Sequence, residues 1–534
     1  MAQNAYFNNE YESVGEHAPK KLFAVDKRDF IFTGLLFGMA LLIVVFGLYG
    51  GFAFGFTLTG VAVFGVLTAY LAKGSKRIKA YPFLCAVLAV ALFSVFSVTS
   101  NNTIRFFGFL GAVILSLIWC VSLSNRKHKP GDMGLVASVF SPIFEQTFPN
   151  IPTTVISIFS QKKNLGKTVG KIALGAVIAL PVLLVVVPLL MSSDEAFSGL
   201  VGSIGSNLLS GAFKVGLALL ITVLLLSYCF SLKKDCVEDT QKKARTGTDT
   251  VVLASFLSAL SVCYVLYLLS QLAYFFSAFK GILPEEYTFT VSEYARRGFF
   301  EMSVIAIINF ITVYIASFLS VKKENKSPII IRIICTFISI FTLLIIGTAL
   351  SKMALYIKCF GMTELRITTS AFMVFLAVVF VFLIGKIYVP KIEVLRAAAV
   401  TAGVILVLLG TVNVNRVVAG YNYNAYQSKK LQSIDVSEIY QLGDEGVPYL
   451  VALTKDSSQQ VAKDAKQYLL QYINDERYYE VEVKSASKKT MYVVGDKTYN
   501  SPEEYTLSLL WAYDALDVFI KENPKEFTYI ANAG

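Results

Sequence analysis

About eleven apolar stretches, each close to the length needed to cross a lipid bilayer, divide this chain. Roughly 20 mostly apolar residues cover the hydrocarbon core, and Lys and Arg gather in the loops between these stretches. The pattern predicts an all-α polytopic transmembrane helical bundle of about 11 spans. The expected spans begin at Ile31, Phe52, Tyr81, Phe106, Ile172, Val215, Val251, Phe299, Pro328, Ala371 and Ala397.

Composition excludes several other classes of protein. A chain of 534 residues that is 55% hydrophobic and 16% charged, with a mean hydropathy of +0.61, exceeds what a water-soluble core can hide. The net charge of +11 comes from short loops beside apolar spans, so no nucleic-acid partner is expected. Seven cysteines show no CxxC pairing, and the only histidines are His17 and His128. We therefore predict no metal site, no cofactor and no catalytic triad.

The basic residues predict the orientation of the spans. Alternate loops are rich in Lys and Arg, for example 73–79, 233–245 and 386–396, whereas the loops between them are poor and one carries Arg105 alone. Basic loops remain in the cytoplasm. The amino terminus is thus expected inside and the carboxyl terminus outside the membrane.

Three regions follow from this pattern: a cytoplasmic tail at 1–29, a bundle at 30–415 and a soluble extracytoplasmic domain at 416–534. Within the bundle, residues 134–160 contain four interrupting polar or proline positions and are expected to lie as an amphipathic segment at the inner membrane face. The C-terminal domain is expected to be mainly helical, with helices at 435–453, 458–472 and 501–520 and a β-hairpin that pairs 479–483 with 491–494. Ser501, Pro502 and Glu504 suggest the start of the last helix.

Polar residues near the outward ends of the spans form the candidate site. Two carboxylates, Asp194 and Glu195, could hold a cation or act as acid and base, although charges at a helix start equally complement its dipole. Arg297 and Glu301 are four residues apart at the start of a span and can form an ion pair. The candidate polar outer cluster consists of Asp194, Glu195, Arg296, Arg297, Glu301, Lys358 and Arg366.

Lys358 and Arg366 belong to the outward connection 352–366, which mixes aromatic, basic and acidic residues. They could bind a lipid phosphate or an anionic polymer. Cations that extend to the interface beside an aromatic belt are the alternative explanation, and the more common one.

Several short motifs, in a fixed order, resemble bacterial multi-pass membrane protein families called domain of unknown function 4153 and 4173. They are the stretches 193–197, 294–301, 355–366, 413–415 and 421–422, followed by Tyr440, Leu442, Asp444 and Pro448. The resemblance covers roughly residues 170 to 455 and implies a protein of the bacterial cytoplasmic membrane. It implies no activity and no catalytic residue.

Two functions remain open from the sequence. The first is an envelope-associated anchoring, sensing or partner-binding protein without catalysis, which contacts membrane lipids and binds an envelope protein or lipid-linked partner through residues 416–534. The second is a lipid-linked transferase or a flippase-like transporter with a polar outward cavity. The usual acidic residue of membrane glycosyltransferases is missing from the first outward loop, which is little more than Gly50 and Gly51.

Overall fold

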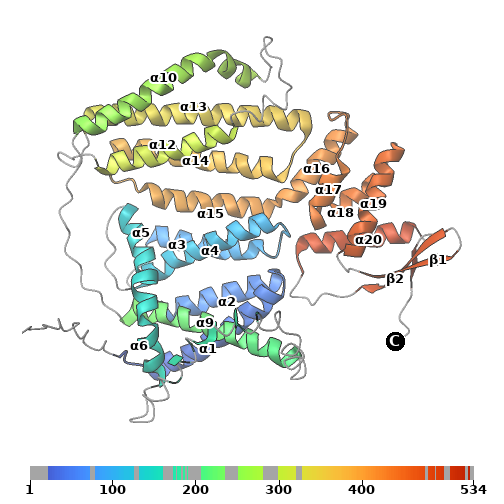
Figure 1. Ribbon diagram of the computed structural model, residues 1–534, viewed down its shortest axis with the longest axis horizontal. Coiled ribbons are helices and arrows are strands. Elements are labelled where there is room, and N and C mark those ends of the chain that lie inside the picture. The colour runs from blue at the N-terminus through green and yellow to red at the C-terminus, as the bar shows by residue number, and fades with distance from the viewer. Residues whose placement is uncertain are drawn as a thin grey trace, which may run out of the picture. The chain divides into compact units, whose positions relative to one another are not determined.

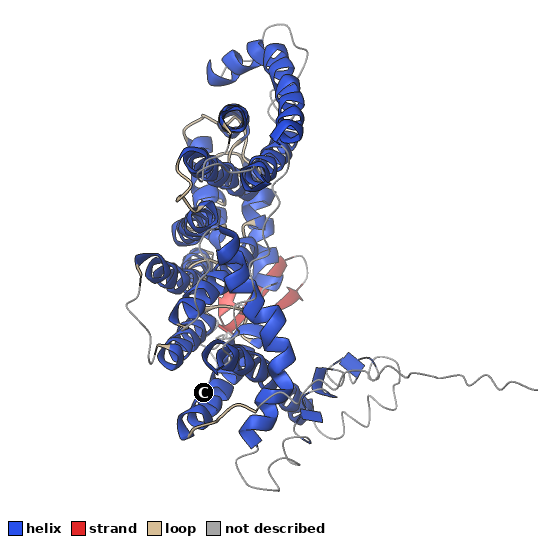
Figure 2. Ribbon diagram, turned by 90° about the vertical axis from the view of Figure 1, so that its left-hand side faces the viewer, coloured by secondary structure: helices blue, strands red, loops and turns tan. Residues whose placement is uncertain are grey.

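The computed structural model describes residues 22–72, 79–124, 132–159, 206–234, 250–280, 299–319, 328–475, 479–486, 489–497, 505–523 and 527–529, together with scattered positions between 172 and 189. Helices dominate these residues, and their only strands lie in the C-terminal region (Figure 2).

The apolar helices agree with a multi-pass membrane protein. Eight helices in the described residues have the length and hydropathy of a span, and two further apolar helices, 80–95 and 302–317, are shorter. The expected span that begins at Ile172 is described only at scattered positions. A total of about eleven therefore stays a prediction. The helices concerned are α1 (Lys27–Ile43), continued by the π-helix η1 (Val44–Tyr49), then α2 (Phe54–Leu71), α3 (Ala80–Val95), α4 (Asn102–Leu123), α9 (Ser206–Lys234), α10 (Thr250–Lys280), α12 (Phe299–Leu319), α13 (Ile329–Phe360), α14 (Glu364–Tyr388) and α15 (Val394–Val412).

The chain divides into two compact units. The first comprises residues 1–41 and 141–236, where α6 (Phe148–Phe159) packs on α9. Polar side chains take part in the packing of α9: Asn150 Nδ2 of α6 donates to Ser231 Oγ at 3.1 Å. Ser227 Oγ donates at 2.7 Å to the carbonyl of Thr147, which immediately precedes α6. Such hydrogen bonds hold helices together where lipid removes the hydrophobic drive for association.

The expected inner-face segment is helical throughout its described length. It consists of α5 (Asp132–Ser141), the π-helix η2 (Pro142–Thr147) and α6, and Pro152 lies inside α6. The prolines therefore do not interrupt the helix as much as the sequence suggests. The position of this segment at a membrane face remains a prediction.

The second unit comprises residues 42–140 and 237–534 and contains most of the bundle. In Figure 1, α13, α14 and α15 follow one another antiparallel, and α15 packs next on α3 and α4. Gly410 allows the close approach of α15 to α3, since a Cβ there would lie 2.3 Å from the Val95 side chain. Farther along, α10, α12 and α13 share a buried polar contact in which Asn309 Nδ2 donates to Thr342 Oγ1 at 2.9 Å and Tyr264 donates to Asn309 Oδ1.

The C-terminal region contains the expected helix 458–472, as α19, but departs from the prediction at the other two helices. The expected helix 435–453 is split, because Gly443 has a φ of +65°. The last helix begins at Leu507, where Thr506 Oγ1 caps the Leu509 N–H, and not at Ser501; residues 498–504 lie outside the described part. The helices are α16 (Val414–Gln427), α17 (Val436–Gln441), the 3-10 turn η3 (Gly443–Glu445), α18 (Val447–Leu453), α19 (Gln459–Asp475) and α20 (Leu507–Glu522).

The predicted β-hairpin is confirmed. Strand β1 (Tyr479–Ala486) pairs antiparallel with β2 (Lys489–Lys497), with Val481 opposite Val494 and Val483 opposite Tyr492. A third strand, β3 (Phe527–Tyr529), lies parallel to β2 and was not expected from the sequence.

Candidate functional site

The C-terminal helices share one hydrophobic core with the end of the bundle. Buried Leu450, Leu469 and Leu516 belong to the same cluster as Val95 of α3 and Ile104 of α4. The expected boundary between residues 415 and 416 falls inside α16. The region after α15 is thus packed against the bundle, and its separation as a domain of its own stays a prediction.

A buried carboxylate lies at the centre of this contact. Glu445 is 2% exposed, and its Oε1 accepts hydrogen bonds from Thr99 Oγ1 (3.0 Å), the Ser100 N–H (3.1 Å) and Ser508 Oγ (2.7 Å). These three donors come from the α3–α4 loop and from α20. The other oxygen, Oε2, is buried without a hydrogen-bond partner.

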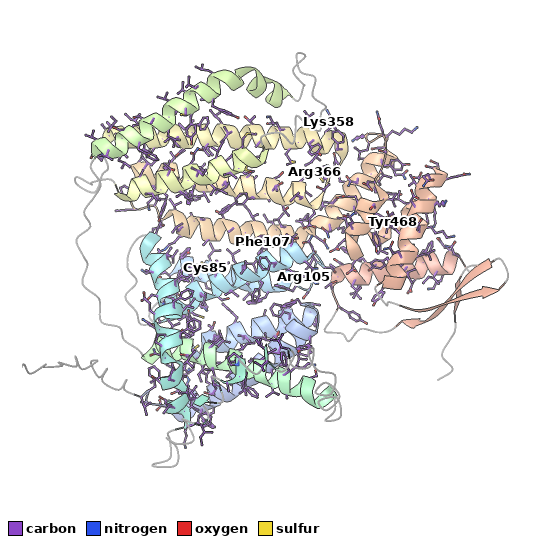
Figure 3. All side chains as sticks on the ribbon, viewed as in Figure 1. Cys85, Arg105, Phe107, Lys358, Arg366 and Tyr468 are labelled. Carbon is purple, nitrogen blue, oxygen red and sulfur yellow. The ribbon has the colours of Figure 1, made fainter. Side chains whose placement is uncertain are left out.

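A second acid and one arginine extend the network. Asp444 accepts hydrogen bonds from Ser100 Oγ and, at 2.7 Å, from the Tyr472 hydroxyl. Arg105 Nε donates to the Thr99 carbonyl at 2.8 Å, and its guanidinium interacts electrostatically with Asp444 and Glu445. Figure 3 shows Arg105 where α4 reaches the C-terminal helices. Arg105, predicted from the sequence to lie in a loop, thus lies in the first turn of α4 and interacts with both acids.

The Asn-Val-Asn motif at the α15–α16 junction completes the network. Asn413 has a φ of +57° and donates from Nδ2 to Ser508 Oγ at 2.8 Å. Asn415 accepts from Asn101 Nδ2 at 2.8 Å and donates to the Leu442 carbonyl at 3.2 Å. We call this set the docking network; it comprises Thr99, Ser100, Asn101, Arg105, Asn413, Asn415, Asp444, Glu445, Thr506 and Ser508.

A second contact joins two further motifs of the sequence. The Asn422 side chain accepts from the Met362 N–H (2.7 Å) and donates to the Met362 carbonyl (2.8 Å). Gly361 has a φ of +77°, and a Cβ there would lie 2.5 Å from Asn422 Oδ1. Only glycine fits this close approach, so the Tyr-Asn and Phe-Gly-Met motifs are explained by the same contact.

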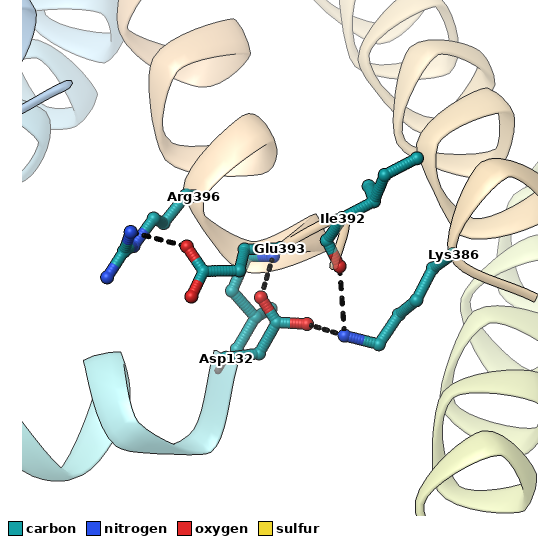
Figure 4. Close-up of polar contacts among 6 residues, drawn as sticks. Asp132, Lys386, Ile392, Glu393 and Arg396 are labelled. Atoms are coloured by element: carbon teal, nitrogen blue, oxygen red, sulfur yellow. Dashed lines mark hydrogen bonds and ion pairs between the residues drawn. The ribbon is translucent and has the colours of Figure 1, made fainter. Parts of the chain in front are cut away.

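Ion pairs occupy the other end of the second unit's helices. Asp132 of α5 pairs with Lys386 of α14, and its Oδ1 accepts from the Leu395 N–H at 3.0 Å in the first turn of α15 (Figure 4). Glu393 pairs with Arg396 on the same connection. These residues fix the α14–α15 turn on α5.

The predicted polar outer cluster can be followed only in part. Asp194, Glu195, Arg296 and Arg297 lie outside the described residues, as therefore does the proposed ion pair with Glu301. Glu301 lies in the first turn of α12, and nothing is described of its side chain. Lys358 and Arg366 lie at the same end of the helices as Arg105 (Figure 3). Lys358 is exposed and Arg366 is half-buried.

Arg366 closes the turn between α13 and α14. Its guanidinium donates to the carbonyls of Phe360, the last residue of α13, and of Gly361, which follows it. The same guanidinium lies 4.1 Å from the ring centroid of Tyr356. A cation at this position complements the carbonyl end of the helix dipole. Glu438 lies near Arg366, and its pKa is raised above the ordinary value. Burial is the larger cause and the charge of Asp435 the next, whereas Arg366 lowers this pKa.

Sequence reasoning missed Glu445, Ser100 and Asn101. The contacts of the α3–α4 loop with Glu445 and Asn415 join residues that are 314 to 346 positions apart in the chain. The signals were partly visible, because Asp444 and the Asn-Val-Asn motif carried the family resemblance. Among the residues that the structure describes, no group of three His, Cys, Asp or Glu side chains is arranged to hold a metal ion.

These features define the class: a multi-pass helical membrane protein whose C-terminal helices are held on one end of the bundle by buried polar groups. The family model described as "Domain of unknown function (DUF4153)" matches residues 83–453. The chain belongs to this family. The match begins with α3, earlier than the motifs of the sequence suggest, and so includes Asn101 and Arg105. No curated protein and no solved structure matches the chain.

Proposed function

We propose that this protein is an integral component of the bacterial cytoplasmic membrane that holds its C-terminal region at the outer face for binding another envelope component, without catalysing a reaction. The alternating basic loops support an amino terminus inside and residues 416–534 outside. The family match and the apolar helices support the membrane location.

The observation that carries the proposal is the way the C-terminal region is attached. A flexible linker would be enough to anchor a mobile domain. Here, instead, the buried Glu445 accepts hydrogen bonds from the α3–α4 loop and from α20. A common hydrophobic core adds to them. Rigid attachment fixes the distance and orientation of a binding surface relative to the bilayer, which lowers the entropic cost of binding a second membrane-bound partner.

Helix α19 offers the surface for such a partner. Lys463, Gln467 and Gln471 are exposed and follow one another at a spacing of four residues, so they share one face of the helix. The opposite face supplies Ala465, Leu469 and Ile473 to the core. Because one face of α19 is fixed in the core, its exposed polar face can bind a partner without a change in the backbone of this protein.

Photo-crosslinking in living cells tests this proposal. A benzophenone amino acid placed singly at Lys463, Gln467 or Gln471 is expected to capture the same protein or lipid-linked adduct from all three positions. The matched control is Phe106, an exposed residue of the apolar helix α4, which should yield only lipid adducts. Adducts that are identical at α19 and Phe106, or none at α19, would reject a binding surface there.

Reporter fusions test the orientation separately. Alkaline phosphatase fused after Gly534 should be active outside the membrane, and a fluorescent reporter that matures only in the cytoplasm should stay dark. The reverse result would place the C-terminal region inside and refute the proposed topology.

A lipid-linked transferase or transporter is the second candidate function, and one observation favours it. The unpaired Glu445 Oε2 and the nearby Arg105 put a carboxylate and a guanidinium at one end of the bundle. If Glu445 acts on a substrate, Glu445→Gln should abolish function while the folded protein persists in the membrane. If Glu445 serves the contact alone, function should fall only in proportion to the folded fraction.

A further inference from the structure

The first half of α20 differs in polarity from the second half. Its sequence Leu-Ser-Leu-Leu-Trp-Ala-Tyr contains no charged residue, whereas the following Asp-Ala-Leu-Asp-Val-Phe-Ile-Lys-Glu contains four. Leu507 and Leu510 in the first half are 41% and 43% exposed. Val518 in the second half is also exposed, but it stands among charged residues, whereas the two leucines belong to a stretch without any. We infer that the leucines lie against an apolar environment.

Hydrogen bonds place this first half level with the ends of apolar helices. The Leu507 N–H donates to the Ser97 carbonyl at 2.9 Å, just beyond α3. The Phe54 N–H, in the first turn of α2, donates to the Tyr505 carbonyl at 3.2 Å. Exposed Phe54, Phe106 and Val412 belong to the same ends of α2, α4 and α15. The exposed leucines are therefore level with exposed apolar side chains at these ends of the candidate spans.

An arginine and a tryptophan lie beside the leucines. The Arg416 guanidinium stacks on the Trp511 ring, 3.2 Å from its centroid, and Arg416 is exposed. It is the only charged residue of α16. Tryptophan is enriched at membrane–water interfaces, and guanidinium groups bind phosphate oxygens with two parallel hydrogen bonds. Stacking leaves the edge of the guanidinium available for such bonds.

We propose that Arg416, Leu507, Leu510 and Trp511 form a lipid-headgroup site. The leucines enter the acyl-chain boundary of the leaflet at this end of the bundle, and Arg416 binds the phosphate of one lipid while Trp511 lies at the headgroup level. The site would set the depth of the C-terminal region in the membrane. It depends on the membrane location of the bundle and is independent of any partner at α19.

Tryptophan fluorescence tests the site directly, because the chain has two tryptophans. The full-length Trp119→Phe protein, whose single tryptophan is Trp511, is reconstituted in liposomes with brominated phosphatidylcholine. Lipid brominated high on the acyl chain should quench its emission several-fold more than it quenches a tryptophan on the charged half of α20. The matched control is Trp119→Phe/Trp511→Phe/Val518→Trp, since Val518 is 49% exposed on the same helix. Equal quenching at both positions, or no quenching of Trp511, would overturn the proposal.

Trp119 Nε1 donates to Thr68 Oγ1 at 2.8 Å, so its replacement could impair folding. The same quenching is then obtained as the difference between the unaltered protein and Trp511→Phe. The headgroup contact has its own test: adding phosphatidylglycerol to neutral liposomes should change Trp511 emission, and Arg416→Gln should remove that change. An unaltered response in Arg416→Gln would overturn the assignment of the phosphate to Arg416.

Discussion

The two ends of the second unit's helices hold their neighbouring segments by different means. Where the C-terminal region packs, a nearly inaccessible Glu445 accepts from hydroxyl and backbone donors, and amide side chains supply the remaining contacts. At the other end, Asp132 forms an ion pair with Lys386, which is partly exposed. At one end, hydroxyl and backbone donors surround a buried carboxylate and Arg105 lies near it. At the other end, the buried Asp132 pairs directly with a cation that is partly exposed.

This difference has an energetic consequence. A buried carboxylate is tolerated only while its donors remain in place, and each donor left unpaired by a substitution costs about 1–3 kcal/mol. An ion pair with one partly hydrated member loses less, because water replaces some of the lost interaction. The C-terminal contact should therefore be the more sensitive of the two, and the following predictions test that order.

The largest effect is expected at Glu445. Glu445→Leu removes the acceptor shared by Thr99, Ser100 and Ser508, and should lower the free energy of unfolding by about 3–5 kcal/mol. Glu445→Gln retains one acceptor oxygen and should cost less. Denaturant titration in micelles, followed by tryptophan emission, measures both. The control is Glu522→Gln, which breaks an exposed ion pair and should change the free energy of unfolding by no more than about 1 kcal/mol. If Glu445→Leu lost no more stability than this control, the buried contact would not be the more sensitive one.

The ion-pair end should respond less. Lys386→Met leaves Asp132 buried without its cation and should cost about 2–3 kcal/mol, below the value for a fully buried pair because Lys386 is partly hydrated. Adding Asp132→Asn should restore most of the loss, since the amide oxygen still accepts from the Leu395 N–H. Thermal unfolding of the single and double variants measures this. A double variant no more stable than Lys386→Met would show that the ion pair does not account for the effect.

Two glycines separate backbone strain from steric contact at the C-terminal end. Gly361→Ala should cost about 3 kcal/mol, because φ is +77°, ψ is −179° and the new Cβ would meet Asn422. Gly443→Ala has a comparable φ of +65° with nothing within 4 Å, and should cost about 1–2 kcal/mol. Unfolding midpoints of both variants give the comparison. Equal losses would assign the whole effect to backbone conformation.

The smallest effect concerns pH. The pKa of Glu438 is raised in the folded protein, so the stability linked to its protonation is present below the ordinary pKa near 4.5 and is lost as pH rises through the raised value. Glu438→Gln should thus gain slightly in stability relative to the unaltered protein on passing from pH 4 to pH 7. Melting curves of the two proteins at both pH values measure the difference. A difference that shrinks with rising pH would contradict the sign.

Local patterns predicted much of the fold. Ten of the expected spans correspond to apolar helices, and the hairpin pairs as alternation in its strands indicates. Each of these depends on residues that are close in sequence, so hydropathy and periodicity suffice. The start of α20 was misplaced at Ser501, because Tyr505 and Thr506 are not helical. Thr506 caps the helix and also contacts Ser100 of the α3–α4 loop, a contact that the sequence does not show.

Less of the candidate site could be predicted from the sequence. Arg366 was noticed as an outward cation, but its role at the end of α13 depends on carbonyls that only the folded turn brings to it. Glu445 and Thr99 are 346 residues apart, and neither stands out by residue type. A buried carboxylate and an exposed one have the same letter in a sequence.

The sequence by itself determined that this is a membrane protein, because transfer of apolar segments into lipid is a property of each segment alone. It also predicted a boundary between residues 415 and 416, which falls inside α16. The tertiary structure decided which polar residues meet. Hydrogen bonds and ion pairs depend on distances of a few ångströms between atoms that hundreds of residues can separate, so the docking network exists only in the folded chain.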